Sequence, residues 1–269
     1  MKSLVDKTYK GLIDAVDKFA NCSTDVSIKP QKIVKKIGSS VNMPNYSYHC
    51  DNYINIALSN PIIIKALQKI ADKYYGGQIR EIISNGIVLT EKNFPRLWNN
   101  YLYCCKKLDV FSIPVYITNK LTGVNALSVQ IDKDQLILLS FNATIKLNDA
   151  EQRFLIGHEL GHIQCGHLVA HTIQGLLYDL NKRSEILGEV LSELVDVPLY
   201  RWYRTSEFTA DRAGFLCCED LSIINNLFNK IGNQVKMSPY RELKELTEAY
   251  PNLCLRYREL SSFAIMCGI

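Results

Sequence analysis

The sequence predicts an α+β fold that is predominantly helical, with a small mixed sheet near the middle of the chain. Apolar residues recur at helical spacing up to about residue 110 and again after about residue 148. Between residues 112 and 142 the spacing changes to that of short strands separated by turn-forming residues. Helices before and after a run of strands are typical of the α+β class. The length of 269 residues allows one large domain or two small ones.

Two stretches before residue 110 carry the first helical pattern. The N-terminal MKSLVDKTYKGLIDAVDKFA has apolar residues at helical spacing, and its lysines and aspartates interrupt what would be the apolar core of a signal peptide. A second apolar stripe runs through EKNFPRLWNNYLYCCKKL and comprises Phe94, Leu97, Trp98, Tyr101, Leu102, Cys105 and Leu108. An N-terminal helical region is therefore expected over residues 1–95.

Three short segments follow that are rich in apolar and β-branched residues: SIPVYIT, GVNALSVQ and QLILLSF. Turn-forming residues separate them, among them Asn119, Gly123 and Asp132. These segments are expected to be the strands of the small sheet.

The remaining helices are predicted from their caps and apolar stripes. Asn148 is followed three residues later by Glu151, the pattern of a capping box that opens a helix through FLIGHELGHIQCGH. A second helix is expected to contain SEFTADRAGFLCC, and a third to run from a cap at Asp220 to a stop at Gly232. Ser238–Pro239 is expected to begin a last pair of helical segments.

Composition narrows the class of protein. A net charge of +4 gives no reason to expect a nucleic acid or an anionic membrane as partner. No uncharged stretch reaches the roughly 18 residues of a membrane span, and the longest candidate, residues 172–203, is amphipathic. The nine cysteines include no C-x-x-C motif, and Cys104–Cys105 and Cys217–Cys218 lie in apolar segments as expected of buried free thiols. We therefore expect a cytoplasmic protein without a transmembrane helix.

The stretch FLIGHELGHIQCGH has the residues of a metal site. On a helix His158 and His162 point about 40° apart, so both can bind one ion, and Glu159 can reach a water bound to that ion. Two neutral imidazoles and a glutamate in this spacing are typical of zinc hydrolases, in which the glutamate takes a proton from the metal-bound water. The alternative is a polar helix face that binds nothing. The apolar neighbours argue against it, because unpaired histidines would be costly on a buried helix.

A catalytic zinc needs a third protein ligand and an open fourth position. The longer metzincin motif is absent, since Cys165 and Leu168 stand where it requires glycine and histidine. On a continuous helix His167 would face away from the site, so we expect both His167 and His171 either to hold a ligand from behind or to lie on the surface. The better candidate is Glu207 in SEFTAD.

Asp211 follows Glu207 by four residues on the same face of its expected helix. There it can orient a ligand imidazole through the nitrogen that the metal does not use.

These motifs resemble a known family. GHELGHIQCGH followed some forty residues later by SEFTADRAG is similar to the HtpX-like, CAAX-prenyl-protease type of zinc metallopeptidase, metallopeptidase family forty-eight, within the gluzincins. FPRLWNNYLYCCKKL, IPVYIT and VNALSV resemble the segments before that family's metal helix, and AYPNLCLRYREL resembles a segment after it. The resemblance covers about residues 90–260. It implies a gluzincin-like catalytic domain over residues 96–269. Where the family's membrane enzymes carry transmembrane helices, this chain has the charged segment 172–200, so it resembles the family's soluble members.

The resemblance also implies roles for residues outside the metal motif. The strand containing Asn125 and Ala126 would form the edge of a cleft and accept an extended peptide; the alternative is an ordinary edge strand. Tyr250 stands where the family usually has a histidine, and its hydroxyl is expected to donate a hydrogen bond to the oxyanion. Arg256 and Arg212 are further cationic candidates, with structural ion pairs as the alternative.

Together these observations predict a zinc-dependent endopeptidase with one Zn²⁺ per chain, held by His158, His162 and Glu207. Glu159 is expected to be the general base, and the substrate a peptide or an unfolded protein. One alternative is a zinc-bound latent or inactive protein that acts by binding a protein partner. Another is an interaction module whose histidines bind no metal. Cleavage specificity, oligomeric state and pathway are left open by the sequence.

Overall fold

The structure is a computed structural model that describes residues 43–48, 51, 76–131, 134–168, 171, 197–232 and 253–268. The helix expected at the N-terminus, most of the charged segment 172–203 and the start of the helical pair at 238–239 lie outside these residues, as does Tyr250. The domain boundary at residue 95 stays a prediction.

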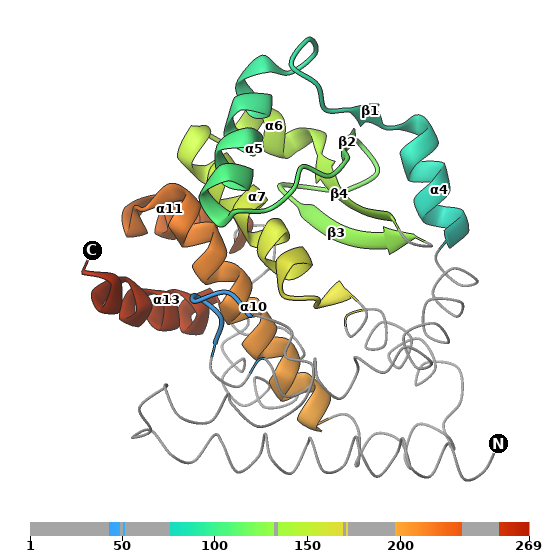
Figure 1. Cartoon of the computed structure of the whole chain (residues 1–269). Coiled ribbons are helices and arrows are strands. Elements are labelled where there is room, and N and C mark those ends of the chain that lie inside the picture. The colour runs from blue at the N-terminus through green and yellow to red at the C-terminus, as the bar shows by residue number, and fades with distance from the viewer. Residues whose placement is uncertain are drawn as a thin grey trace, which may run out of the picture.

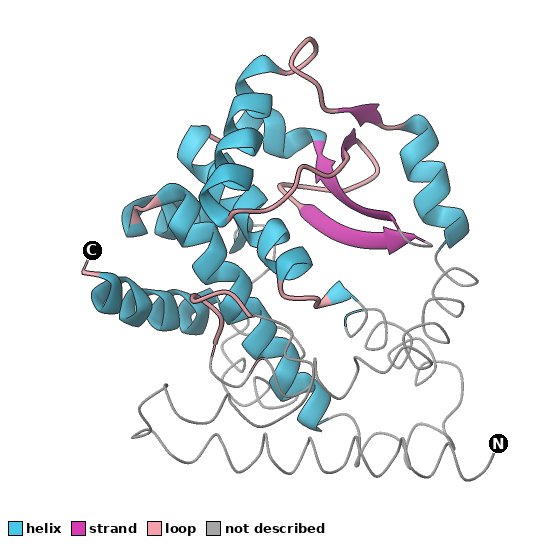
Figure 2. Ribbon diagram, viewed as in Figure 1, coloured by secondary structure: helices cyan, strands magenta, loops and turns pink. Residues whose placement is uncertain are grey.

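The described residues form seven helices and one four-stranded sheet, which confirms the α+β, helix-rich class (Figures 1 and 2). The helices are α4 (Gly76–Asn85), α5 (Pro95–Leu108), α6 (Phe141–Lys146), α7 (Asp149–Gln164), α10 (Val197–Cys218), α11 (Leu221–Gly232) and α13 (Leu253–Cys267). The strands are β1 (Ile87–Val88), β2 (Val115–Thr118), β3 (Ala126–Ile131) and β4 (Asp134–Ser140).

The sheet is mixed and has the order β1-β2-β4-β3. β2 runs parallel to β4, whereas β1 and β3 run antiparallel to their neighbours. The three expected strands are confirmed. β1 lies in the region expected to be helical and was missed, because two exposed residues are too few to show a strand period. Within the described part of the chain β3 is the edge of the sheet that lies nearest α7 (Figure 1).

The predicted capping box opens α7. The side chain of Asn148 accepts from the backbone N–H of Glu151 at 2.9 Å, and the Glu151 carboxylate accepts from the N–H of Asn148 at 2.9 Å. From this cap the helix runs into the interior, and all of its residues from Phe154 to His162 are buried. A helix that is buried on all sides over this stretch is typical of a core element.

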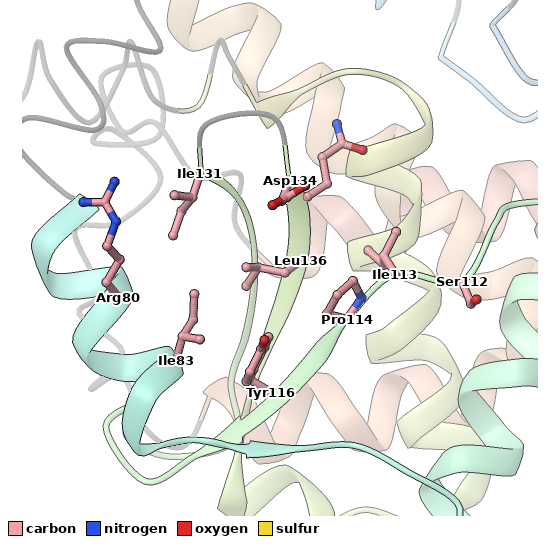
Figure 3. A pocket seen from close by; sticks show the side chains of 10 residues that line it. Arg80, Ile83, Ser112, Ile113, Pro114, Tyr116, Ile131, Asp134 and Leu136 are labelled. Carbon is pink, nitrogen blue, oxygen red and sulfur yellow. The ribbon is translucent and has the colours of Figure 1, made fainter.

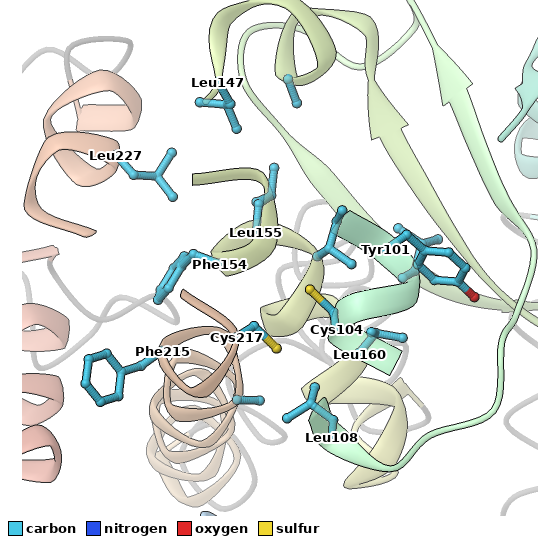
Figure 4. Close-up of a cluster of buried hydrophobic side chains, with 14 of the residues drawn as sticks. Tyr101, Cys104, Leu108, Leu147, Phe154, Leu155, Leu160, Phe215, Cys217 and Leu227 are labelled. Carbon is cyan, nitrogen blue, oxygen red and sulfur yellow. The ribbon is translucent and has the colours of Figure 1, made fainter. Parts of the chain in front are cut away.

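The core lies where α5, α7 and α10 meet (Figure 4). Tyr101 and Cys104 of α5 contribute to it, and Leu102 is 40% exposed, so the predicted stripe was wrong at Leu102 and omitted Cys104. Cys217 of α10 is also buried as a free thiol, as expected. Among the described helices none is long and apolar enough to cross a bilayer.

Two glycines let α7 and α10 approach closely. A Cβ atom on Gly157 would lie 2.7 Å from the Sγ of Cys217, and one on Gly161 would lie 2.7 Å from the Cβ of Ala213. Real Cβ atoms do not approach other atoms so closely. Because each glycine precedes a histidine of the metal motif, the same contact that packs the helices brings α10 within reach of both imidazoles.

Candidate metal centre

His158 and His162 lie one turn apart on α7 and point toward the same position. Their Nε2 atoms are 3.1 Å apart, and both rings are buried. Glu207 reaches this position from α10. Its Oε2 is 3.6 Å from the Nε2 of His158, and its Oε1 is 3.4 Å from the Nε2 of His162. Two helices that are about fifty residues apart in the chain thus present three ligand atoms to one point.

These three distances fit a tetrahedral zinc ion. With metal–ligand bonds of about 2.0–2.1 Å and tetrahedral angles, neighbouring ligand atoms lie about 3.3 Å apart. The observed 3.1, 3.4 and 3.6 Å surround that value. Two imidazoles and one carboxylate are also a donor set of catalytic zinc sites, where a fourth position is left for water. The residues present therefore fit the metal that the sequence predicts.

Asp211 holds the outer nitrogen of His158. Its Oδ1 lies 3.0 Å from the Nδ1 of His158, so the ring donates there and its Nε2 is left to face Glu207. Arg256 of α13 donates to both oxygens of Asp211, at 2.6 and 2.7 Å, and its Nη1 lies 3.3 Å from Glu207. The geometry therefore places Arg256 behind the predicted ligands, where its positive charge lies beside two buried carboxylates.

His167 holds the outer nitrogen of His162. The two Nδ1 atoms are 2.9 Å apart, and the Nε2 of His167 lies 2.9 Å from the Oδ2 of Asp51. The expected orientation of His167 away from the site is wrong, because it assumed a continuous helix, whereas a place behind a ligand is one of the two that the sequence analysis allowed. α7 ends at Gln164, and Gly166 adopts a positive φ of 72° that turns the chain back.

His171 lies beside the same predicted ligand, His162. Its Nε2 is 3.0 Å from the Oγ of Ser206, and its ring centroid is 4.6 Å from that of His162. This position is one of the two that the sequence analysis allowed, namely behind a ligand rather than on the open surface.

Glu159 lies between the predicted ligands and the edge strand β3. Its Oε2 accepts from the backbone N–H of Ser128 at 2.7 Å. Burial is the largest effect on this carboxyl and raises its pKa, although the charge of His158 and the Ser128 hydrogen bond partly oppose the shift. A carboxylate with a raised pKa is suited to accepting and returning a proton near neutral pH.

The backbone of β3 is directed partly toward this carboxylate. Asn125 and Ser140 exchange hydrogen bonds, the carbonyl of Asn125 accepting from the N–H of Ser140 at 2.9 Å. Because alternate residues of an antiparallel strand direct their backbone groups to opposite sides, Ala126 and Ser128 direct theirs away from β4, and that of Ser128 reaches Glu159. The predicted pair thus divides, with Asn125 paired to β4 and Ala126 presenting its backbone at the edge.

The two predicted imidazole ligands have different electrostatic surroundings. Burial lowers the pKa of His158, but the hydrogen bond to Asp211 and the charges of Glu207 and Asp211 together raise it above its ordinary value. For His162 burial again acts first, and the nearby His158 and His167 add to it, so its pKa falls well below the ordinary value. A neutral imidazole is the form that binds zinc.

Other candidates lie elsewhere. Arg212 is stacked between the rings of Tyr48 and Phe263 and so contacts no predicted ligand there. A pocket between α4 and the sheet is lined by residues such as Arg80, Tyr116 and Leu136, and its lining includes none of the predicted site residues (Figure 3).

Sequence reasoning missed Asp51 and the close-packing glycines Gly157 and Gly161. Asp51 lies more than a hundred residues before His167, which it contacts, so no local spacing points to it. The glycines did carry a signal, because they recur four residues apart beside the two histidines, the spacing of one helix face.

Comparison with known proteins agrees with this geometry. The model of Peptidase family M48 matches residues 111–264. The chain is 28% identical over 152 residues to the "Plastoglobule-localized metallopeptidase 48, chloroplastic" of Arabidopsis thaliana. That similarity covers 56% of this chain and 44% of the relative, so the chain spans less than half of that protein's length. No solved structure matches the chain.

Proposed function

The chain belongs to peptidase family M48, a family of metallopeptidases, and on that premise we propose that it is a zinc-dependent endopeptidase of the gluzincin type. The observation that carries the proposal is the convergence of His158, His162 and Glu207 at tetrahedral ligand distances, with the carboxylate of Glu159 beside them. One Zn²⁺ per chain is proposed.

The proposed roles follow from the contacts. When bound, zinc supplies polarisation of the scissile carbonyl and a lowered pKa of the attacking water. Glu159 accepts a proton from that water and returns it to the leaving amine, for which its raised pKa is suited. Asp211 keeps the proton of His158 on Nδ1, so that Nε2 stays available as a ligand.

The substrate is proposed to be a peptide or an unfolded protein, bound in extended form along β3. The outward backbone groups of Ala126 and Ser128 can pair with such a strand, and a peptide paired there would pass beside Glu159. A substrate that pairs with Ser128 would also compete for the N–H that now donates to Glu159, leaving the carboxylate to the water.

Tyr250 and Arg256 were also predicted to be catalytic. Tyr250 would donate a hydrogen bond to the oxyanion; it lies outside the described residues. Arg256, predicted as catalytic, contacts Asp211 and Glu207, which favours the alternative of a structural ion pair.

The test is the Glu159→Gln variant. The amide cannot accept the proton, so casein cleavage should fall by about 10²- to 10⁴-fold, while bound zinc stays at one per chain because Glu159 is not a ligand. Exposed Glu91 offers a matched control, and Glu91→Gln should retain activity. Full activity in Glu159→Gln would refute the role of the base. Zinc well below one per chain in the purified protein would refute the metal site.

A further inference from the structure

We propose that Asp51, acting through His167, positions His162 for the metal, so that a segment outside the matched family region completes the site. The inference rests on the proposed zinc site. It concerns Asp51 and His167 as positioning residues, since neither is proposed to touch the metal.

The first step is the geometry of the chain of contacts. His162, His167 and Asp51 are joined by two contacts of 2.9 Å, from Nδ1 to Nδ1 and from Nε2 to Oδ2. All three residues are at most 3% exposed, so water does not compete at these nitrogens. Hydrogen bonds in such surroundings are stronger than exposed ones.

The second step is that only one direction of donation satisfies the whole chain when His162 is a ligand. A neutral His162 that binds through Nε2 carries its proton on Nδ1, which must donate to the Nδ1 of His167. His167 then carries its own proton on Nε2, which must donate onward. An obligate acceptor is required at the end, and the carboxylate of Asp51 is one. An amide in its place would offer an N–H as well as an oxygen, and would bring no charge.

The third step is that the segment carrying Asp51 is fixed to both metal-bearing helices. Tyr46 donates to the Oε1 of Gln164, the last residue of α7, at 2.6 Å. The N–H of Tyr48 donates to the Oγ1 of Thr209 on α10 at 3.0 Å. Residues 43–48 lie near α10 and α13 in Figure 1. Asp51 is joined to this segment, because its backbone N–H donates to the carbonyl of Tyr48 at 3.0 Å.

The fourth step explains why His167 can take part. Gly166 has a φ of 72°, which ordinary residues rarely adopt, and a Cβ there would meet nothing within 4 Å. The glycine is thus required by the turn rather than by crowding. This turn after Gln164 brings the third histidine of GHELGHIQCGH back behind the second.

A second metal is the rival interpretation, since Asp51, Cys165 and His167 offer ligand atoms within 4.8 Å of one another. The relay is favoured because a His167 that bound a metal through Nε2 would carry its proton on Nδ1 and donate it to His162, which would then hold its own proton on Nε2 instead of binding the proposed zinc there. The two ideas differ in zinc stoichiometry, which is one for the relay and two for the rival.

The experiment compares full-length protein carrying Asp51→Asn or His167→Gln with wild type. Zinc affinity is measured by chelator competition, and the visible spectrum is recorded after Co²⁺ substitution. Exposed Asp134 provides the matched control, Asp134→Asn. Loss of a hydrogen-bond partner of a ligand typically lowers metal affinity by about 10- to 100-fold. Because Asp51 acts through His167, we expect Asp51→Asn to lower zinc affinity by about tenfold, at the lower end of that range, and to shift the Co²⁺ spectrum.

A purely structural role would lower stability in urea without moving the Co²⁺ spectrum, and that result would overturn the relay. So would unchanged zinc affinity in both variants, or two zinc ions in the wild type with one in Asp51→Asn. His167→Gln tests the same link without removing a buried charge, so the inference stays testable if Asp51→Asn does not fold. Wild-type protein that binds zinc without cleaving casein would contradict the proposed function alone, because affinity and spectrum do not depend on hydrolysis.

Discussion

His158 and His162 point at the same position from one helix, yet their outer nitrogens are held in different ways. His158 contacts the carboxylate of Asp211 directly. His162 contacts a second imidazole, which in turn contacts the carboxylate of Asp51. Asp211 lies on α10 within residues 111–264, the part that matches the family, whereas Asp51 lies before it.

The two imidazoles are therefore supported by different parts of the chain: His158 by the region that matches the family, and His162 by a residue that lies before it. One imidazole is oriented by a carboxylate that Arg256 also holds, so its support is local to three packed helices. The other depends on a segment that reaches in from the N-terminal side. The metal site as a whole is therefore expected to be sensitive to changes in a part of the chain that carries none of its proposed ligands.

The largest effect should come from Glu207, the proposed ligand that lies beside both imidazoles. Glu207→Gln replaces an anionic oxygen ligand by a neutral amide, while both imidazole supports remain. We expect zinc affinity to fall by more than about 100-fold, the upper end for residues that only hold a ligand. Chelator competition measures it. A loss no larger than that of Asp51→Asn would mean that Glu207 does not bind the metal.

A smaller effect is expected when only the direct support is removed. Asp211→Asn should weaken zinc binding by about 10- to 100-fold, more than Asp51→Asn. The reason is that Asp211 contacts a proposed ligand directly, whereas a second imidazole lies between Asp51 and its proposed ligand. It also removes one of the two carboxylates beside the buried Arg256, so the urea midpoint should fall as well. Equal losses in the two variants would remove the distinction between direct and relayed support.

Combining the two variants sharpens this test. If the two supports act on separate imidazoles, the free-energy losses of Asp51→Asn and Asp211→Asn should add to within about 0.5 kcal/mol. A double variant no weaker than Asp211→Asn alone would mean that Asp51 acts through Asp211 and not through His162.

The sequence predicted one half of this site and missed the other for a physical reason. His158, Glu159 and His162 were found from helical spacing, and Glu207 with Asp211 from a carboxylate pair on a second apolar helix. These are periodic patterns within single helices. The relay depends on where α7 ends, since the turn at Gly166 reverses the direction of His167. It depends further on a contact of residue 51 across more than a hundred residues.

The fold shows the same division. The three longer strands and the capping box were predicted because each has a pattern within a few residues. β1 was missed, since its pairing with β2 is a tertiary contact of two residues. Leu102 was misplaced on the buried face because a stripe of helical spacing does not show which neighbours cover its edge. The roles of the predicted ligands stay proposals, as do those of Tyr250 and the N-terminal helices.

Two glycine substitutions distinguish helix packing from the turn that serves the relay. Gly161→Ala places a methyl group 2.7 Å from the Cβ of Ala213, so α7 and α10 must separate. We expect a loss of about 1–3 kcal/mol in the free energy of unfolding, with weaker zinc binding through both imidazoles. Gly166→Ala meets no atoms but strains the positive φ by about 1–2 kcal/mol, and should disturb only the position of His167. Urea unfolding and the Co²⁺ spectrum separate the two; equal effects would contradict the packing argument.

The smallest effect on zinc affinity is expected at the first residue of α7, far along the helix from the imidazoles. There Asp149 accepts hydrogen bonds from Arg96 and Asn100. The hydrogen bond to Arg96 is the largest cause that lowers the pKa of Asp149, with Asn100 next. A lowered folded-state pKa means that this stabilisation is fully present above the ordinary aspartate value of about 3.9 and is lost as the pH falls through the folded value. Asp149→Asn should therefore lower stability slightly at pH 7 and flatten its acid dependence, as followed by urea unfolding at several pH values. Because half-exposed ion pairs contribute little, zinc affinity should not change. A clear loss of zinc in this variant would mean that affinity follows the stability of α7 as a whole, and the contrast between the two imidazole supports would then have no separate meaning.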